Sequence, residues 1–267
     1  MNLSFKLTEP PPALAVTQSI EPLIDPVFVS DLHLALERPA TLQRFFRFMQ
    51  VDAPRHLELV ILGDLFEFWI GDDAAPAAKP VIDALAAASK GKQRVFVMHG
   101  NRDPLIGHDF ARATGATLLA DPIIADVVGT ETLLSHGDAW CTNDLAYQQF
   151  RAMARNPESQ RGFLGKSVDE RIAMAKGARM LSDTAKSNKA MDIMDVTPEA
   201  VVAALSDAGV RRIIHGHTHR PAAHVIDLDG VTAERWVLPD WDLDDAEPRG
   251  GYLDFVDGRP RLVLFDD

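Results

Sequence analysis

Short apolar runs alternate along the chain with polar clusters and with segments of helical length. Each run is rich in β-branched residues and ends at Gly, Asp or His, which is typical of a buried strand. The runs cover residues 27–29, 57–62, 95–98, 132–134 and 212–214. Residues 39–51, 76–89 and 197–208 have helical spacing, the last with a proline in its first turn. This alternation predicts a layered α/β domain whose polar residues collect at the carboxyl ends of strands.

Two later regions depart from this rhythm. Residues 144–195 have no strand-like run and mix Ala, Met, Arg and Lys with scattered large apolar residues, so they are interpreted as a helical insertion. Residues 223–265 alternate like antiparallel strands, with hairpin turns at Asp229-Gly230 and Asp257-Gly258.

Composition and length are those of a folded globular protein, with 267 residues, 46% hydrophobic and 25% charged. We expect a flexible tail over residues 1–26 and one domain over residues 27–267. No apolar run reaches the roughly 18 residues of a transmembrane helix. A net charge of −12 argues against nucleic acid as a partner. The single cysteine, Cys141, excludes an intramolecular disulfide and a cysteine-based zinc site.

Polar clusters at five predicted strand ends carry the candidate chemistry. They are Asp31-x-His33, Gly63-Asp64, Gly100-Asn101-Arg102-Asp103, His136-Gly137-Asp138 and His215-Gly216-His217-x-His219. Residues two apart in an extended segment point the same way, so the first and last clusters each offer a pair of ligands to one place. Carboxylate, imidazole and amide groups suit Mn²⁺ or a similar divalent ion. Two such ions about 3.5–4 Å apart bind a phosphoryl group and activate water.

Each cluster alone is weak evidence for a metal site, because Gly-Asp after a strand is usually an ordinary turn and a single histidine is usually a structural residue. The ordered set is specific, and it resembles the calcineurin-like metallophosphoesterases. Most of that superfamily has Gly-Asn-His at the third cluster, where this chain has Arg102. This arginine, together with residues 30–34, 63–73 and 215–221, makes the chain similar to the branch of UDP-2,3-diacylglucosamine diphosphatases. The resemblance runs from about residue 27 to residue 241.

The resemblance implies a four-layer α/β sandwich of two mixed sheets flanked by helices, with a helical lid at about residues 144–195. It also implies two Mn²⁺ per chain, with Asp64 bridging them. By this resemblance, one ion is held by Asp31, His33, Asp64 and His219, and the other by Asp64, Asn101, His136 and His217. Asp103 and Asp138 are candidates for hydrogen bonds that orient the ligand imidazoles.

The same resemblance implies water attack on the α-phosphorus of UDP-2,3-diacylglucosamine in lipid A synthesis, giving UMP and 2,3-diacylglucosamine 1-phosphate. The implied catalytic residues are Asp64, Asn101, Arg102 and His217. The implied substrate contacts are Asn101, Arg102, Asp144, Ser182, Lys186, Lys189 and His217. Lys186 departs from the family's Asn, which puts the type of that contact in doubt.

A lipid substrate implies a cytoplasmic enzyme that contacts the cytoplasmic face of the inner membrane peripherally, and we expect no obligate protein partner. Three alternatives stay open. The chain is a metallophosphoesterase of a soluble substrate, such as a nucleotide pyrophosphatase or a phosphodiesterase, or it is a non-catalytic scaffold on the same fold. The third alternative concerns the insertion alone, which is an ordinary amphipathic helix pair packed on the core in place of a lid, or is both on different faces.

Overall fold

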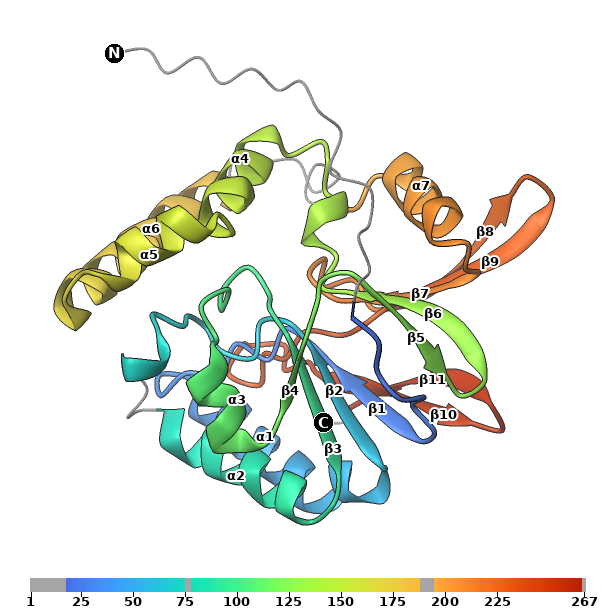
Figure 1. Cartoon of the computed structure of the whole chain (residues 1–267), viewed down its shortest axis with the longest axis horizontal. Coiled ribbons are helices and arrows are strands. Elements are labelled where there is room, and N and C mark those ends of the chain that lie inside the picture. Colours follow the sequence, from blue (N-terminus) through green and yellow to red (C-terminus); the bar gives the residue numbers. More distant parts are fainter. Residues whose placement is uncertain (1–17, 75–77, 188–194, 266–267) are drawn as a thin grey trace.

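Two β-sheets packed face to face form the centre of the protein, and helices cover their outer faces (Figure 1). The computed structural model describes residues 18–74, 78–187 and 195–265. Within them, one sheet has the strand order β11-β10-β1-β2-β3-β4. Its strands are β1 (Pro26–Val29), β2 (Glu58–Leu62), β3 (Arg94–Met98), β4 (Thr117–Leu119), β10 (Gly251–Val256) and β11 (Arg259–Leu264). Strands β1 to β4 are parallel, and β10 and β11 add an antiparallel hairpin.

The second sheet has the strand order β5-β6-β7-β9-β8. Its strands are β5 (Ile123–Val127), β6 (Thr130–Ser135), β7 (Arg212–His215), β8 (Ala222–Leu228) and β9 (Val231–Val237). Strand β7 pairs in parallel with both β6 and β9, whereas the two hairpins of this sheet are antiparallel. Both sheets are therefore mixed, and the predicted turn at Asp229-Gly230 joins β8 to β9 as expected.

Strands β1, β2 and β3 are buried on both faces, which explains why the sequence shows them as continuous apolar runs. Alternate residues enter different cores because successive side chains of a strand point to opposite faces. In β1, Val27 and Val29 pack toward the helices, while Phe28 enters the core between the sheets. Leu134 and Ile214 reach that same core from the second sheet.

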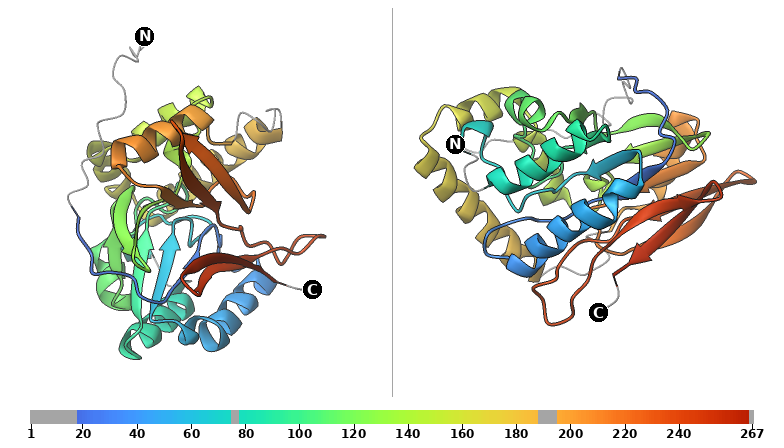
Figure 2. Two further views of the ribbon diagram at one scale, coloured as in Figure 1. Left: turned by 90° about the vertical axis from the view of Figure 1, so that its right-hand side faces the viewer. Right: turned by 90° about the horizontal axis from the view of Figure 1, so that it is seen from below.

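Three helices cover the outer face of the six-stranded sheet, and one covers the other sheet (Figure 2). The first group is α1 (Pro39–Val51), α2 (Lys79–Lys90) and α3 (His108–Thr114), and the single helix is α7 (Pro198–Ala208). Proline opens α1 and α7, where the missing amide hydrogen costs nothing, and Gly209 ends α7 with a left-handed φ of 67°. The order helix, sheet, sheet, helix is the four-layer sandwich predicted from the sequence.

The insertion is helical, as predicted, and forms a separate layer beside the sandwich (Figure 1). It contains α4 (Leu145–Ala154), α5 (Pro157–Leu164) and α6 (Val168–Ser187). Asp144 and Asn156 cap α4 and α5 by accepting hydrogen bonds from backbone amides. Within the described parts of the chain, every helix is too short or too polar to span a lipid bilayer.

Some elements were not predicted from the sequence. Helix α3 and strands β4 and β5 have only seven, three and five residues, which is too short for a clear periodicity. Residues 18–25, which the sequence assigns to a flexible tail, are instead packed against the sheets. Leu23 is fully buried and bridges Val127, and the Gln18 amide hydrogen-bonds the backbone at Leu118 and Ala120. Residues 1–17 lie outside the described residues.

We expect Phe28→Ala to lower the free energy of unfolding by about 3–5 kcal/mol, because it leaves a cavity in the core between the sheets. Urea denaturation would show a lower midpoint with an unchanged slope. Val225→Ala is the matched control, because that side chain is 81% exposed and the change should stay within about 0.5 kcal/mol. Equal midpoints for the two variants would contradict this account of the core.

Candidate metal centre and substrate site

The seven predicted metal ligands come from loops that follow parallel strands of both sheets. Asp31 and His33 follow β1, Asp64 follows β2, Asn101 follows β3, His136 follows β6, and His217 and His219 follow β7. The carboxyl ends of parallel strands meet at one edge of a sheet. Because the two sheets are packed face to face, their two edges bring the loops together.

Contacts link these side chains to one another. The two carboxylate oxygens of Asp64 face different histidines, with Oδ2 3.9 Å from His33 Nε2 and Oδ1 3.8 Å from His136 Nε2. His136 Nε2 also lies 3.1 Å from the Asn101 Oδ1 atom. On the other side, Asp31 Oδ1 lies 3.4 Å from His219 Nε2.

The structure contains two groups of three residues whose potential ligand atoms all lie within 4.8 Å of one another inside each group. One consists of Asp31, His33 and His219, and the other of Asp31, Asp64 and His136. The ring of His217 packs edge-on against His136 with 5.0 Å between centroids. All seven predicted ligands are therefore assembled in one place.

Five of these residues have a left-handed backbone conformation, which is uncommon outside glycine. Their φ angles are 53° at Asp31, 48° at His33, 52° at Asp64, 69° at His217 and 55° at His219. Such conformations cost free energy and persist where the surrounding structure fixes them, typically at functional sites. The clustering of this strain on the candidate ligands marks the site independently of side-chain chemistry.

Two glycines allow the loops to approach closely. A Cβ at Gly216 would lie 2.2 Å from Ser30 Oγ and 2.3 Å from Asp31 Oδ2. A Cβ at Gly100 would lie 2.0 Å from Asp64 Oδ1. Any larger residue at either position would displace a ligand carboxylate, so the glycines of these motifs serve the packing of the site.

Three of the candidate ligand histidines face an acceptor with their Nδ1 atoms, which would leave Nε2 for an ion. His136 Nδ1 lies 2.9 Å from the Leu62 carbonyl oxygen, His219 Nδ1 lies 3.3 Å from Asp240, and His33 Nδ1 lies 3.8 Å from Glu67. The sequence reasoning missed Asp240 and Glu67. Glu67 lies within the run 63–73 that carries the resemblance, whereas Asp240 stands in a loop without any motif signal.

The prediction that Asp103 and Asp138 orient the imidazoles was wrong for the contacts that the structure describes. Asp103 accepts hydrogen bonds from the backbone amides of Gly100, Leu65 and Phe66, at 2.8, 2.8 and 3.3 Å, and so joins two of the ligand loops. It acts on the loops and not on a histidine ring.

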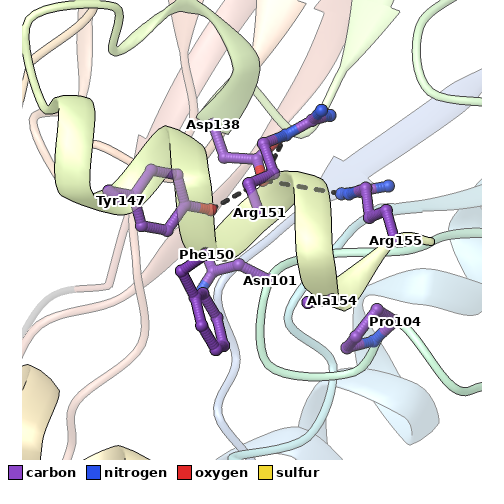
Figure 3. A pocket seen from close by; sticks show the side chains of 8 residues that line it. All are labelled: Asn101, Pro104, Asp138, Tyr147, Phe150, Arg151, Ala154 and Arg155. Carbon is purple, nitrogen blue, oxygen red and sulfur yellow. Dashed lines mark hydrogen bonds and ion pairs between the residues drawn. The ribbon is translucent and has the colours of Figure 1, made fainter. Parts of the chain in front are cut away.

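Asp138 instead anchors the insertion to the loop that carries His136 (Figure 3). Its Oδ2 atom accepts from Tyr147 Oη at 2.7 Å and from Arg151 Nε at 2.9 Å, and Arg155 lies 3.6 Å away. The Tyr147 ring lies 5.5 Å from the His217 ring. Helix α4 therefore packs directly on the candidate metal site.

Burial and mutual charge shift the pKa values of the ligands. Burial raises the pKa of Asp64 to about 7. Burial lowers the pKa of His136 and His219, but their carboxylate neighbours outweigh it and raise them to about 9 and about 10. Burial lowers the pKa of His217 to about 3. Burial works against the charge on Asp31, but the adjacent histidines hold its pKa well below the ordinary value.

The donor set fits a divalent cation. Asp31 Oδ1 is buried without a hydrogen-bond partner, and such an atom is costly unless something compensates its charge. The assembled donors are carboxylate oxygens, imidazole nitrogens and one amide oxygen, which suit borderline and hard divalent ions. Cys141 packs in the core under α7 and is not one of these donors.

The predicted substrate contacts are only partly placed by the structure. Arg102 lies beside the site, where its backbone amide donates to Asp64 Oδ1 at 2.8 Å. Asp144 is buried at the start of α4 and accepts from the Tyr147 amide. Ser182 and Lys186 lie in α6, but their side chains are outside the description, and Lys189 lies outside the described residues. Contacts of all five residues with a substrate stay predictions.

Large apolar side chains are exposed on the insertion. They are Leu145, Phe150, Met153, Leu164, Val168 and Met174, each between 38% and 61% exposed. Phe150 and Ala154 line the side of α4 that adjoins Asn101 and Pro104 (Figure 3). Apolar surface of α4 thus adjoins the candidate metal site, and further large apolar side chains are exposed on α5 and α6.

Comparison with known proteins agrees with this geometry. The family model described as calcineurin-like phosphoesterase matches residues 26–221. A protein of Bordetella pertussis named UDP-2,3-diacylglucosamine hydrolase is 50% identical over 241 residues, which are 89% of this chain and 93% of the relative. Proteins with the same name from Aromatoleum aromaticum and Pseudomonas aeruginosa are 49% and 46% identical, over 89% and 81% of this chain and 96% and 90% of theirs.

We expect binding of Mn²⁺ to the metal-free protein to release protons and to strengthen as pH rises from about 6 to 8. Coordination requires ionised Asp64 and neutral His136 and His219, whose raised pKa values leave them partly or fully protonated at neutral pH. Titration calorimetry in buffers of different ionisation enthalpy measures the released protons. His219→Ala should release fewer, and an affinity that is constant over this pH range would contradict the assignment.

Proposed function

The chain belongs to the calcineurin-like phosphoesterase family, and on that premise we propose that it hydrolyses the diphosphate of UDP-2,3-diacylglucosamine. The products are UMP and 2,3-diacylglucosamine 1-phosphate, which places the enzyme in lipid A synthesis. The observation that supports the proposal is the assembly of the seven candidate ligand residues beside Arg102 in a chain about half identical to relatives with that name.

Two Mn²⁺ ions are proposed as the cofactor. Asp31, His33, Asp64 and His219 would hold one, and Asp64, Asn101, His136 and His217 the other. The placement of the two Asp64 oxygens toward His33 and His136 supports a bridging role. When bound, two divalent ions supply a water acidified enough to act as the nucleophile near neutral pH.

Arg102 is proposed to stabilise the charge that develops on the phosphoryl oxygens. Its guanidinium is planar and permanently charged, and the side chain is only 16% exposed at the edge of the candidate ligand cluster. The hydrogen bond from its amide to Asp64 fixes the backbone beside the metal site, so the side chain is directed by the same loop that carries Asn101. Asn101 and His217 would contact the same phosphoryl group from the ligand cluster.

The insertion is proposed as a lid that covers the acyl chains. Its exposed side chains offer apolar surface next to the site, and burial of acyl chains there is favourable. Asp144, Ser182, Lys186 and Lys189 are proposed to contact the sugar and phosphate portion. A cytoplasmic location with peripheral contact to the inner membrane follows from a membrane-embedded substrate, and the same apolar side chains would make that contact.

A soluble UDP-sugar is the second candidate substrate, because the metal chemistry is the same. The exposed apolar surface of α4 to α6 favours the acylated substrate.

The test measures release of UMP from UDP-2,3-diacylglucosamine and from the non-acylated UDP-glucosamine with Mn²⁺. We expect turnover of the acylated substrate and very little of the soluble one. Equal rates would favour the soluble candidate. Release of UMP from neither would refute the proposed reaction.

Variants then test the assigned residues with the acylated substrate. His33→Ala should abolish activity, because it removes a ligand, and Arg102→Ala should lower kcat/KM by about 10²-fold or more, because it removes a donor to the phosphoryl oxygens. Arg112→Ala is the matched control, since that arginine is exposed on α3 and pairs only with Asp109 among the described ion pairs. Full activity of Arg102→Ala would remove this residue from the mechanism.

A further inference from the structure

Glu67 is a nearly buried carboxylate that neither the metal site nor the proposed reaction requires as a ligand. We propose that Glu67 is a positioning residue that holds Arg102 and Arg179 together in the free enzyme. When the substrate binds, its phosphate groups take the place of the Glu67 carboxylate at the two arginines. The inference rests on the proposed function for the nature of the natural substrate. It assigns to Glu67 the role of an internal competitor of the bound anion.

Glu67 stands where three parts of the chain meet. Its Oε1 atom lies 3.4 Å from Arg102 NH1 and forms an ion pair with the guanidinium of Arg179 in α6. Its Oε2 atom lies 3.8 Å from His33 Nδ1. One carboxylate therefore contacts the loop after β3, the insertion and a candidate metal ligand.

The loop that carries Glu67 is held firmly, so the carboxylate is kept at this position. The Glu67 amide donates to the Leu34 carbonyl, and the rings of Phe66 and Trp69 stack at 4.7 Å between centroids. The Trp69 indole donates to Asp72 Oδ1 at 2.9 Å. Reorganisation on binding an anion then falls on the long arginine side chains and not on Glu67.

Glu67 lies next to two positive charges but, among the described residues, makes no hydrogen bond of good geometry through its Oε1 atom. Its Oε1 atom is buried without a geometrically good hydrogen bond, although two guanidinium groups adjoin it. A guanidinium binds phosphate oxygens in a bidentate manner, and the diphosphate of the substrate carries two negative charges against one on the carboxylate. Exchange of Glu67 for a phosphate group is therefore favourable for the two arginines.

A second ion pair, between Arg171 and Asp73, attaches the insertion without contacting Arg102. It allows the role of Glu67 at Arg102 to be tested apart from the attachment of α6. Arg171, also in α6, is buried and donates to the Ile70 carbonyl at 2.6 Å and to Asp73. It ties α6 to the same loop without touching the candidate ligands. The pairs of Glu67 and Asp73 thus attach one helix to one loop, but only the first includes Arg102.

The experiment titrates UMP calorimetrically into the Mn²⁺-saturated full-length protein. Glu67→Gln keeps the shape and removes the competing charge, so it should bind UMP about fivefold or more tightly than wild type, and KM for the acylated substrate should fall in the same direction. Arg102→Ala combined with Glu67→Gln should lose most of this gain, because the two residues act on each other. Affinity for Mn²⁺ is measured first, since Glu67 also faces His33.

Asp73→Asn is the matched control, because it loosens α6 without touching Arg102 and should not tighten UMP binding. Glu67→Asp keeps the charge but draws it back from the guanidinium groups, so it should also bind UMP more tightly, and it serves if Glu67→Gln does not fold. Equal or weaker UMP affinity in the Glu67 variants, or none in any variant, would overturn the proposal. Failure to hydrolyse the acylated substrate would refute the proposed function and leave this comparison valid.

Discussion

Burial of mutually compensating charges where the two sheets meet is the constraint on which the rest of the structure depends. Asp31 and Asp64 are almost fully buried, and isolated carboxylates there would be strongly unfavourable. Histidines from the opposite sheet compensate them, since His136 faces Asp64 and His219 faces Asp31. These two pairs each join a carboxylate of one sheet to a histidine of the other. Packing of the sheets, the left-handed conformations of the loops and the close approach allowed by glycine all serve this one arrangement.

The insertion extends the same electrostatic network outward. Helix α4 is attached through Asp138, which lies two residues after His136, and α6 through Glu67 and Asp73, which lie in the loop after Asp64. Both attachments therefore end on loops that carry candidate ligands. A substrate held between the insertion and the metal site would contact one continuous set of charges. A movement of the proposed lid would therefore act directly on the loops that carry the candidate metal ligands.

Much of the fold could be predicted because its central strands are buried on both faces. Continuous apolar runs such as those that form β2 and β3 show little ambiguity, and each ends at a polar cluster. Short elements at the sheet edges, such as β4, have few residues and mixed burial, so no periodicity identifies them. Residues 18–25 give no strand signal either, and they join the second sheet through the isolated bridge from Leu23 to Val127 and through packing in the core between the sheets.

The sequence by itself determined the order of the ligand motifs, the substitution of arginine at Arg102 and the helical character of the insertion, because these depend on residue type and local spacing. Only the tertiary structure decided which acceptors face the ligand histidines and which carboxylates attach the insertion. Asp240 and Glu67 are remote in sequence from the histidines that they face, and Asp138 contacts α4 instead of a histidine. Such contacts depend on how separate loops pack, and no local pattern along the chain encodes that.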